Sequence, residues 1–457
     1  MTDMPLQILI LAAGEGKRMH SALPKVLLPL AGRPMLAHVI ACARELSPDR
    51  IHVIHGHRGD QVRAAFADQP DLDWVHQVHQ RGTGDAVSVA LAQVPETARV
   101  LVLYGDVPLI RAQTLKPLVA SDNALLMLSA DLFDPSGYGR VIRDELGQVR
   151  AIVEERDCTP EQRTITCVNT GILAADARRL RVWVNNLDAS NTQQEFYLTD
   201  IFAQAAAEGV PATALRCRDE REAFGANDAW QLAQLERQFQ LRQARSLCDQ
   251  GVRLTDPSRF DLRGELTCGS DVEIDANVVF EGRVKLGDSV RIGPFCRIKD
   301  TSLAAGTIVH AHCDLDGAVT HGECNIGPFA RLRPGTELAS GARVGNFVEI
   351  KNSSLGENSK ANHLAYLGDA TIGRDANIGA GTITCNYDGV NKHRTIIEDG
   401  VFIGSNTALV APVTVGKGAT IGAGSTITAN APAAELTVAR AKQTTHTGWA
   451  RPKKDTN

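Results

Sequence analysis

A glycine-containing loop with nearby cations is the first feature of the sequence that could do chemistry. The run LAAGEGKRM (Leu11–Met19) follows a short β-branched segment and precedes Pro24–Lys25. Gly14 and Gly16 let backbone amides approach a phosphate, and the N-terminus of a following helix favours negative charge. The run lacks the glycine pattern of a dinucleotide fingerprint and the GK[ST] of a Walker loop. The glycines alone are equally consistent with a tight turn, but Arg18 and the lysine add two cations that can neutralise a triphosphate.

A carboxylate stands at the end of another strand-like segment. Gly105 and Asp106 follow the run from Val100 to Tyr104 directly. Open α/β sheets bind ligands at the carboxyl ends of their strands. A carboxylate there suits Mg²⁺, which is usually held by one or two protein oxygens together with phosphates and water. Because an ordinary turn before Pro108 could also begin with aspartate, Asp106 alone leaves both interpretations open.

Polar and charged residues also gather in the C-terminal half, between Arg331 and Tyr387. Arg333 and Lys351 are separated by three hexads, so both can project from one side of a coiled scaffold and bind a sugar phosphate. His363 could act as a general base near neutral pH. A solvated charged face and a structural histidine are the alternatives.

Two kinds of element must position these residues. In the N-terminal half, β-branched runs at 8–11, 51–55, 100–104, 125–130 and 168–173 alternate with helical stretches. This alternation predicts a mostly parallel sheet covered by helices on both faces. From Asn227 to about Gln250 the apolar residues recur at helical spacing and predict a connecting helix.

Beyond Gly251 an aliphatic or aromatic residue recurs at every sixth position. The three runs are Ile274, Phe280, Leu286, Ile292 and Ile298; Ile326, Leu332, Leu338, Val344 and Ile350; and Ile403, Leu409, Val415, Ile421 and Ile427. This period suits a coil whose sides are short strands, so that each apolar residue stacks under the next one a full turn up. The pattern breaks at 310–323 and 384–399, and insertions in such solenoids are loops that often carry binding residues.

Length, charge and cysteine usage limit the possible classes. A chain of 457 residues exceeds one ordinary core, and we predict domains at 1–226 and 251–457 joined by a helix at 227–250. The net charge of −5 provides no basic field for nucleic acid, and no apolar run approaches the ~20 residues of a membrane span. The ten cysteines are scattered singly, and no signal-peptide pattern opens the chain, so we expect a cytoplasmic protein with reduced thiols.

Several motifs occur together in the order found in sugar-nucleotide pyrophosphorylases. They are LAAGEGKRM with Pro24–Lys25, GTGDA (82–86), YGDVPL (104–109), GYGR (137–140), IVE (152–154), NTG (169–171) and Asn227. Over essentially its whole length the chain resembles most closely the bacterial bifunctional family that combines N-acetylglucosamine-1-phosphate uridyltransferase with glucosamine-1-phosphate acetyltransferase. The resemblance implies an α/β Rossmann-like nucleotidyltransferase domain followed by a left-handed parallel β-helix of hexapeptide repeats. It also implies synthesis of UDP-N-acetylglucosamine from UTP and acetyl-CoA, with Mg²⁺ as cofactor.

The same resemblance implies roles for residues of the first domain. Arg18 and Lys25 are expected to stabilise the leaving pyrophosphate, and Asp106 and Asn227 are expected to bind Mg²⁺. The residues implied to bind UTP and the acetylated sugar are Leu11, Ala12, Ala13, Gly14, Lys25, Gln77, Gly82, Thr83, Tyr104, Gly105, Asp106, Gly139, Glu154, Asn169 and Asn227.

In the second domain the resemblance makes His363 the base that removes a proton from the 2-amino group of the sugar. The residues implied to hold glucosamine 1-phosphate are Arg333, Lys351, Tyr366 and Asn377. Those implied to bind acetyl-CoA are Ala380, Asn386, Tyr387, Ser405, Ala423 and Arg440, of which Asn386 and Tyr387 are also expected at the sugar. Family members form trimers through this domain, and a tail, here from Arg440 to Lys454, contributes to the site of a neighbouring subunit.

The sequence departs from the family pattern at a few positions. Lys17 replaces a usual Thr, Gln194 and Phe196 replace the more frequent Gly and Tyr, and Asn362 and Ala365 replace Gly and Thr. None of these changes removes an expected metal ligand, so the chemistry should survive. The alternatives are a single-function nucleotidyltransferase whose β-helix only oligomerises, and a non-catalytic regulatory subunit of the same architecture. A single-function nucleotidyltransferase would leave the polar cluster of the β-helix without a function. A regulatory subunit would not require the metal-binding and phosphate-binding residues that are present.

Overall fold

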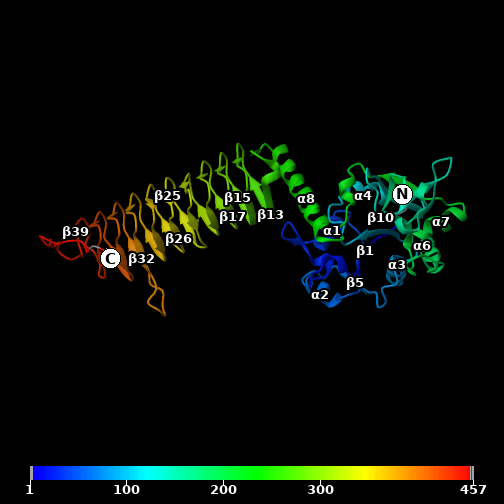
Figure 1. Cartoon of the computed structure of the whole chain (residues 1–457), viewed down its shortest axis with the longest axis horizontal. Helices are drawn as coiled ribbons and strands as arrows, with labels where there is room; N and C mark the ends of the chain where they lie inside the picture. The colour runs from blue at the N-terminus through cyan, green and yellow to red at the C-terminus, as the bar shows by residue number, and fades with distance from the viewer. Residues whose placement is uncertain (1–3, 453, 455–457) are drawn as a thin grey trace. The chain divides into compact units, whose positions relative to one another are not determined.

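The chain divides into two compact units, Met1–Phe239 and Gln240–Asn457 (Figure 1). The computed structural model describes residues 4–452 and residue 454, so Lys453 of the expected tail lies outside the described residues. The division falls within helix α8 (Ala229–Asp249), which is the connecting helix that the sequence predicts. The limits proposed for the two domains stay predictions.

The first unit is built on a sheet with the strand order β11-β7-β10-β6-β1-β4-β5. Strand β1 pairs in parallel with β4 and β6, whereas β10 runs antiparallel between β6 and β7. The strands are β1 (Leu6–Ala12), β4 (Arg50–His55), β5 (Leu72–His76), β6 (Arg99–Tyr104), β7 (Leu125–Asp131), β10 (Cys167–Asp176) and β11 (Thr213–Arg216). The hairpin of β8 (Arg140–Arg143) and β9 (Val149–Val153) attaches to β10. The five strands expected from the β-branched runs are confirmed, and β5 and β11 add to them.

Helices cover both faces of this sheet, as the alternation predicts. On one face Leu9 and Val102 pack with Trp183 and Phe202, which lie on α6 (Ala177–Asn185) and α7 (Ile201–Ala207). On the other face Ile8 and the remaining inward residues of β1 and β6 pack against α1 (Met35–Arg44) and α4 (Ala112–Val119). Residues of one strand alternate between the two cores, so the sheet is buried on both sides. The remaining helices are α2 (Gly59–Ala64), α3 (Thr83–Leu91) and α5 (Pro160–Arg163).

Helix α8 contributes to both units. In its first half Leu235, with 2% of its surface exposed, packs with Met19, Leu30 and Met35. In its second half the fully buried amide of Gln240 accepts a hydrogen bond of 2.7 Å from the backbone of Leu262. None of the helices in the described part of the chain combines the length and hydrophobicity that crossing a bilayer requires.

The second unit is a parallel β-helix. Its described strands, from β12 (Arg253–Leu254) to β39 (Leu436–Thr437), form long sheets in which the strand pairings are parallel (Figure 1). The members of the three hexad runs are all buried, with at most 3% of their surface exposed. The period of six is therefore confirmed as the inward-facing position of each short strand.

The two breaks in the period have different structures. The sequence predicts an inserted loop at 310–323, and this prediction is wrong. Ile298 pairs with Leu315, and Leu315 pairs with Leu332, so the coil continues through β20 (Asp314–Asp316) with turns that are one residue shorter than three hexads. Omitting one residue at a corner shifts the phase of the sequence pattern but keeps the strands stacked. The break at 384–399 is a loop, because Ile372 pairs with Ile397 across an insertion between β32 (Ile383–Cys385) and β33 (Thr395–Ile397).

Candidate active sites

The phosphate-binding loop begins where β1 ends. Gly16 adopts a left-handed conformation with φ of +64°, which glycine adopts readily, and caps the short helix η1 (Lys17–Met19). Arg18 is exposed in this helix. Lys17, one of the departures from the family pattern, makes an ion pair of 2.9 Å with Glu15, and 78% of its side chain is exposed. The loop therefore carries exposed cations beside a carboxyl end of the sheet.

The two expected metal ligands converge on the ammonium group of Lys25. Lys25 begins the short helix η2 (Lys25–Leu27), and its Nζ donates to the carboxylate of Asp106 and, at 3.3 Å, to Oδ1 of Asn227. Asp106 follows β6, and its backbone carbonyl accepts a hydrogen bond from Ala226. The side chains of Lys25 and Asp106 are only 14% and 17% exposed. Two oxygens from separate elements thus face a single cation in a largely dehydrated position.

The strand ends bring the expected nucleotide residues to one edge of the sheet. Leu11 pairs with Tyr104, and its carbonyl accepts a hydrogen bond of 2.9 Å from the amide of Gly105. Ala12 closes β1, so Ala13 and Gly14 continue from the same edge. Burial raises the pKa of Tyr104, and the nearby Glu154 and Asp106 raise it further, while the Thr83 hydroxyl hydrogen-bonds to it.

A second group of expected nucleotide residues is tied together at the start of α3. The buried amide of Gln77 donates to the carbonyl of Gly82 at 3.1 Å and to Asp85 at 2.8 Å. The hydroxyl of Thr83 accepts from the amide of Leu198 at 3.1 Å. These bonds hold the GTGDA segment against the chain segment that follows Phe196.

The residues expected at the sugar come from the β8–β9 hairpin and from β10. The amide of Asn169 donates to the carbonyl of Gly139 at 2.8 Å. A methyl group built on Gly139 would lie 3.4 Å from the carboxylate of Glu154, so the three residues are neighbours. Desolvation raises the pKa of Glu154, while the hydroxyl of Thr199 donates to its carboxylate at 3.1 Å. A half-buried carboxylate with free acceptor capacity can bind hydroxyl or amide groups of a sugar.

The departures at 194 and 196 have clear structural settings. Gln194 has a φ of +56°, a conformation that explains why glycine is the more frequent residue there. Phe196 accepts a hydrogen bond from Gly84 at its carbonyl, and Arg81 lies 5.3 Å from the centre of its ring. The backbone contacts of Phe196 do not depend on a tyrosine hydroxyl.

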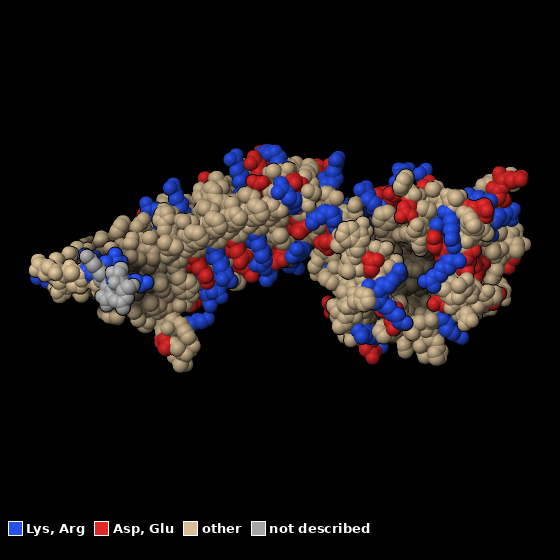
Figure 2. Space-filling view, in the orientation of Figure 1, with Lys and Arg blue, Asp and Glu red and all other residues tan. Residues whose placement is uncertain are grey.

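In the β-helix, a row of alternating charges leads to the expected sugar phosphate site. Figure 2 shows acidic and basic side chains alternating along one edge of this unit. The ion pairs join Arg263, Glu281, Arg297, Asp314, Arg331, Glu349 and Arg333 in succession. Arg333 is the last of them, and its guanidinium donates to Glu349 at 2.8 Å.

Beyond Arg333, Lys351 and Lys392 lie near each other and near the carboxylate of Asp369. The ammonium of Lys392 lies beside that of Lys351 and lowers the pKa of Lys351, with a smaller contribution from Arg333. Lys392 belongs to the inserted loop, where Tyr387 pairs with it across the strand-like turn. Arg333 pairs with Glu349, and Asp369 faces the two lysines, so the three cations exceed the carboxylates beside them and favour an anionic ligand such as a phosphate.

Tyr366 and Asn386 complete this cluster. Tyr366 lies on β29 (Tyr366–Gly368) and pairs with Glu349 of the preceding coil. A side chain at Gly368 would overlap the Tyr366 hydroxyl, so glycine makes room for the phenol over the strand. Asn386 is buried and donates to Asp369. The structure thus brings Arg333, Lys351, Tyr366 and Asn386 together, while Tyr387 stays 61% exposed on the loop.

His363 lies exposed at a corner of the β-helix, at the end of β28 (Lys360–His363). Its Nδ1 is 3.0 Å from Oδ1 of Asn346, one coil earlier. Successive coils continue from this corner with small residues: the amide of Gly381 donates to the carbonyl of Leu364, and the amide of Asn406 donates to that of Ala380. Further along the column, the amide of Gly424 donates to the carbonyl of Ser405, and the guanidinium of Arg440 donates to the carbonyl of Ala423. All residues expected along acetyl-CoA, apart from the loop pair, therefore share one corner with His363.

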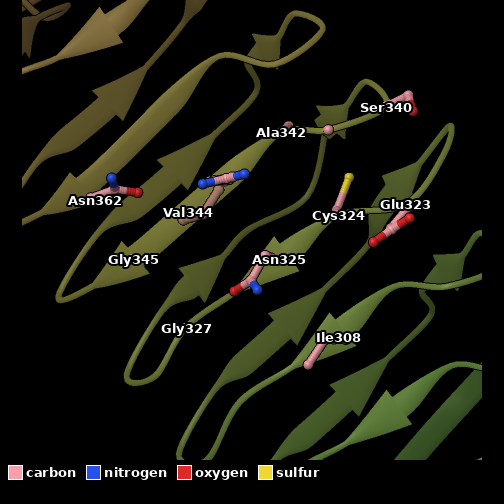
Figure 3. A pocket seen from close by; sticks show the side chains of 12 residues that line it. Ile308, Glu323, Cys324, Asn325, Gly327, Ser340, Ala342, Val344, Gly345 and Asn362 are labelled. Carbon is pink, nitrogen blue, oxygen red and sulfur yellow. The ribbon is translucent and has the colours of Figure 1, made fainter.

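Asn377 is placed differently. It lies on β31 (Asn377–Ile378), between Lys360 and Phe402 of the neighbouring coils, on another sheet from Lys351 and Tyr366. A groove of about 460 Å³ lies across this sheet, and Figure 3 shows the residues that line it. Gly345 and Asn362 line it, so it reaches the corner that carries His363.

Comparison with known proteins extends over the whole chain. Residues 8–161 match the model of the MobA-like NTP transferase domain, and residues 394–429 match that of the bacterial transferase hexapeptide, six repeats. The bifunctional protein GlmU of Stenotrophomonas maltophilia is 62% identical over 450 residues, which cover 98% of this chain and 99% of that protein. The chain belongs to the GlmU family of bifunctional proteins. GlmU proteins of Xylella fastidiosa (strain M12) and Xanthomonas campestris pv. campestris (strain B100) are 60% and 61% identical, each over 99% of both chains.

Membership of the GlmU family confirms the resemblance that the motifs carry. The chain is a bifunctional transferase of UDP-N-acetylglucosamine synthesis, with uridyltransferase and acetyltransferase activities. The single-function and non-catalytic alternatives are thereby set aside.

Three residues of this chain approach the sites although the sequence alone gave them no role there. Lys392 lies beside Lys351 because the inserted loop folds back on the coil, and the polar composition of that loop is the signal for it. Asn346 reaches His363 because the coil between them is one residue shorter than three hexads, which brings the two side chains into register. Thr199 reaches Glu154 across the first unit, and no local pattern indicates this contact.

Proposed function

We propose that the two reactions occur in sequence at the two constellations described above, with acetylation first. The observation that supports the proposal is that two groups of residues suited to different reactions lie in different units of the chain. A cation cluster and an exposed imidazole lie in the β-helix, while a carboxylate–lysine–amide group and a phosphate loop lie in the first unit. Each has the charges that one of the two reactions requires.

In the acetyltransferase reaction His363 acts as the general base. Arg333, Lys351 and Lys392 hold the phosphate of glucosamine 1-phosphate, and Tyr366, Asn377 and Asn386 bind its sugar. The 2-amino group attacks the thioester carbon of acetyl-CoA as the imidazole takes its proton. The support for this assignment is the corner column, where small residues beside His363 leave room for an extended ligand.

In the uridyltransferase reaction, positioning and charge neutralisation provide the catalysis. A phosphate oxygen of N-acetylglucosamine 1-phosphate attacks the α-phosphorus of UTP, and pyrophosphate leaves. Arg18 and Lys25, with Lys17 beside them, stabilise the negative charge that develops on the leaving group. Gln77, Gly82 and Thr83 hold the nucleotide, while Gly139, Glu154 and Asn169 hold the sugar.

Asp106 and Asn227 fit a magnesium site. Both offer oxygen ligands, and both already face the Lys25 ammonium, so the position is built for a cation. Within the described residues no three histidine, cysteine, aspartate or glutamate side chains form a metal-binding group. A site of one carboxylate and one amide suits Mg²⁺, which takes its other ligands from phosphates and water. When bound, Mg²⁺ supplies charge neutralisation at the phosphates.

We propose a homotrimer assembled through the β-helix. Support comes from a row of stacked rings on its surface, Phe295, His312, Phe329 and Phe347, whose centres are 5.0, 4.8 and 5.2 Å apart. The three phenylalanines are 46% to 56% exposed, and a continuous exposed apolar row favours contact with another protein surface. Since Leu364 continues the row, a neighbouring subunit there would approach His363. A Phe329→Glu variant that sediments as a monomer supports this, and one that remains a trimer contradicts it.

We assign the enzyme to the cytoplasm. All ten cysteines lie in the described part of the chain and none forms a disulfide, as expected where thiols stay reduced. UTP and acetyl-CoA are the proposed substrates, with no nucleic acid involved.

The proposed function is tested by incubating the protein with glucosamine 1-phosphate, acetyl-CoA, UTP and Mg²⁺. The expected products are UDP-N-acetylglucosamine, free thiol and pyrophosphate. Omission of acetyl-CoA should stop formation of the nucleotide sugar from glucosamine 1-phosphate but not from N-acetylglucosamine 1-phosphate. Nucleotide-sugar formation from glucosamine 1-phosphate that does not depend on acetyl-CoA contradicts the proposed order.

A further inference from the structure

The imidazole of His363 has a defined hydrogen-bond partner. Its Nδ1 is 3.0 Å from Oδ1 of Asn346, which pairs with it in register across β25 (Arg343–Asn346) and β28. The backbone carbonyl of Asn346 also accepts a hydrogen bond of 3.1 Å from the amide of Leu364. Residues on both sides of the pair are thus linked, and the ring has little freedom to turn away.

Asn346 itself is held in place by its neighbours. Phe347, the next residue, stacks on Phe329 with ring centres 5.2 Å apart. On the other side, Gly345 lies against the carbonyl of Asn362, where a side chain would collide with the backbone. The amide of Asn346 therefore stands at a fixed position of the corner rather than on a mobile loop.

We propose that Asn346 is a positioning residue for acetyl transfer, because its amide oxygen fixes the tautomer of His363. A carbonyl oxygen only accepts, so Nδ1 carries the ring proton and Nε2 keeps its lone pair. This inference rests on the proposed role of His363 as the base, and it identifies Nε2 as the atom that acts.

The proton balance of the step then follows. The new bond forms between the 2-amino nitrogen and the acetyl carbon, and the bond between that carbon and sulfur breaks. Nε2 receives the proton of the amine, and the ring is held as an imidazolium by the same Asn346 oxygen. The proton then passes to the thiolate of CoA, which leaves as the free thiol and restores the starting tautomer.

The remaining polar surroundings of the pair are simple. Arg343 on β25 and Lys360 on β28 are charged, and each lies at the opposite end of its strand from its member of the pair. The next strand, β31, contributes Asn377 and Ile378, which carry no charge. The acceptor for Nδ1 is thus the uncharged amide of Asn346. A carboxylate at this position would favour the protonated ring.

Two substitutions test the proposal in the full-length protein. Asn346→Leu keeps the size of the side chain and removes the acceptor, so kcat for acetyl transfer should fall about tenfold, with KM for acetyl-CoA unchanged. Asn346→Asp keeps an acceptor and adds a negative charge that favours the protonated ring. It should retain kcat within a few-fold at high pH, and the acid limb of its kcat/KM profile should move upward, by up to about one pH unit.

Asn325→Leu is the matched control. Oδ1 of Asn325 lies 2.9 Å from Nε2 of His310, so this is another asparagine–histidine pair, on the same sheet of the β-helix but two coils before Asn346 and His363. The control should leave the rate and the pH profile of acetyl transfer unchanged. Melting temperatures of all three variants should stay within about 2 °C of the wild type, since the Asn346 and Asn325 bonds are exposed.

Several results would overturn the inference. One is an unchanged kcat in Asn346→Leu. A second is an acid limb that does not move in Asn346→Asp, or a plateau in that variant that collapses, as expected if the amide nitrogen rather than the oxygen faces the ring. A fall in rate that only parallels a lower melting temperature would show a structural role. Failure of the proposed function is separate: His363→Ala would then retain acetyl transfer, whatever the Asn346 variants do.

Discussion

Removing the carboxylate of Asp106 should disable uridyl transfer and leave acetyl transfer intact. Asp106 is the charged partner of Lys25 and one of the two oxygens proposed to hold Mg²⁺. In Asp106→Ala both the metal site and the neutralisation of the lysine are lost. We expect kcat for pyrophosphate release to fall at least about 10²-fold, in line with the loss of a preorganised electrostatic group.

The same change should lower the stability of the first unit. Breaking a buried ion pair costs about 3–5 kcal/mol when the remaining charge has no partner. Here the two side chains keep 14% and 17% exposure, and Asn227 still accepts from Lys25, so we expect about 2–3 kcal/mol. For a unit of this size, that corresponds to a fall in melting temperature of about 5–10 °C.

The assay measures pyrophosphate and thiol release across a Mg²⁺ titration, with calorimetry on the same preparations. Asn227→Ala is the graded comparison, because it removes one long hydrogen bond of 3.3 Å and should lower stability by only about 1 kcal/mol. Both variants should require more Mg²⁺, while their thiol release stays within twofold of the wild type. Undiminished pyrophosphate release by Asp106→Ala at ordinary Mg²⁺ would refute the assignment.

Three further predictions concern truncation, pH and the inserted loop. Residues 1–239 should fold alone and transfer uridyl groups. Residues 1–230 should melt about 10 °C lower or more, because they lack Leu235 of α8, which packs with Met19, Leu30 and Met35. Equal melting curves would contradict this. Burial lowers the pKa of His52 and His55 below the usual 6.5, so the stability that they contribute is complete above pH 6.5 and is lost as the pH falls. Denaturant titrations between pH 7 and 5 give the unfolding free energy at each pH. Its change per pH unit should become smaller, by up to about 1.4 kcal/mol, when either histidine is replaced by asparagine. An unchanged pH dependence would argue against this account. Lys392→Ala should raise KM for glucosamine 1-phosphate about tenfold with kcat for uridyl transfer unaffected, and an unchanged KM would remove Lys392 from the phosphate site.

Periodic features of the fold could be predicted from the sequence because the type of each residue indicates whether its position faces the core or the solvent. The aliphatic residue at every sixth position is the one that faces inward, so Leu332 and Ile350 could be identified without knowing any contact. The same logic failed at 310–323, where a coil one residue shorter than three hexads keeps Leu315 stacked but breaks the period. A pattern of this kind records spacing along the chain, and it cannot distinguish one omitted residue from an inserted loop.

The candidate sites show a similar division. Asp106 and Lys25 could be proposed from sequence because strand ends and glycine loops have known positions in an open sheet. The approach of Lys392 to Lys351 could not, because it depends on how an irregular loop folds back over the coil. The placement of Asn377 on another sheet than Lys351 and Tyr366 could not be predicted either, because residues close in sequence can lie on different sides of one coil.

The most direct test of two separate active sites in one chain is to measure thiol and pyrophosphate release by the same preparations of wild type, Asp106→Ala and His363→Ala. Asp106→Ala should release thiol at the wild-type rate and lose pyrophosphate release. His363→Ala should lose thiol release by about 10² to 10⁴-fold and convert N-acetylglucosamine 1-phosphate normally. A His363→Ala protein that acetylates glucosamine 1-phosphate within a few-fold of wild type, or either folded variant that loses both activities, would contradict the account.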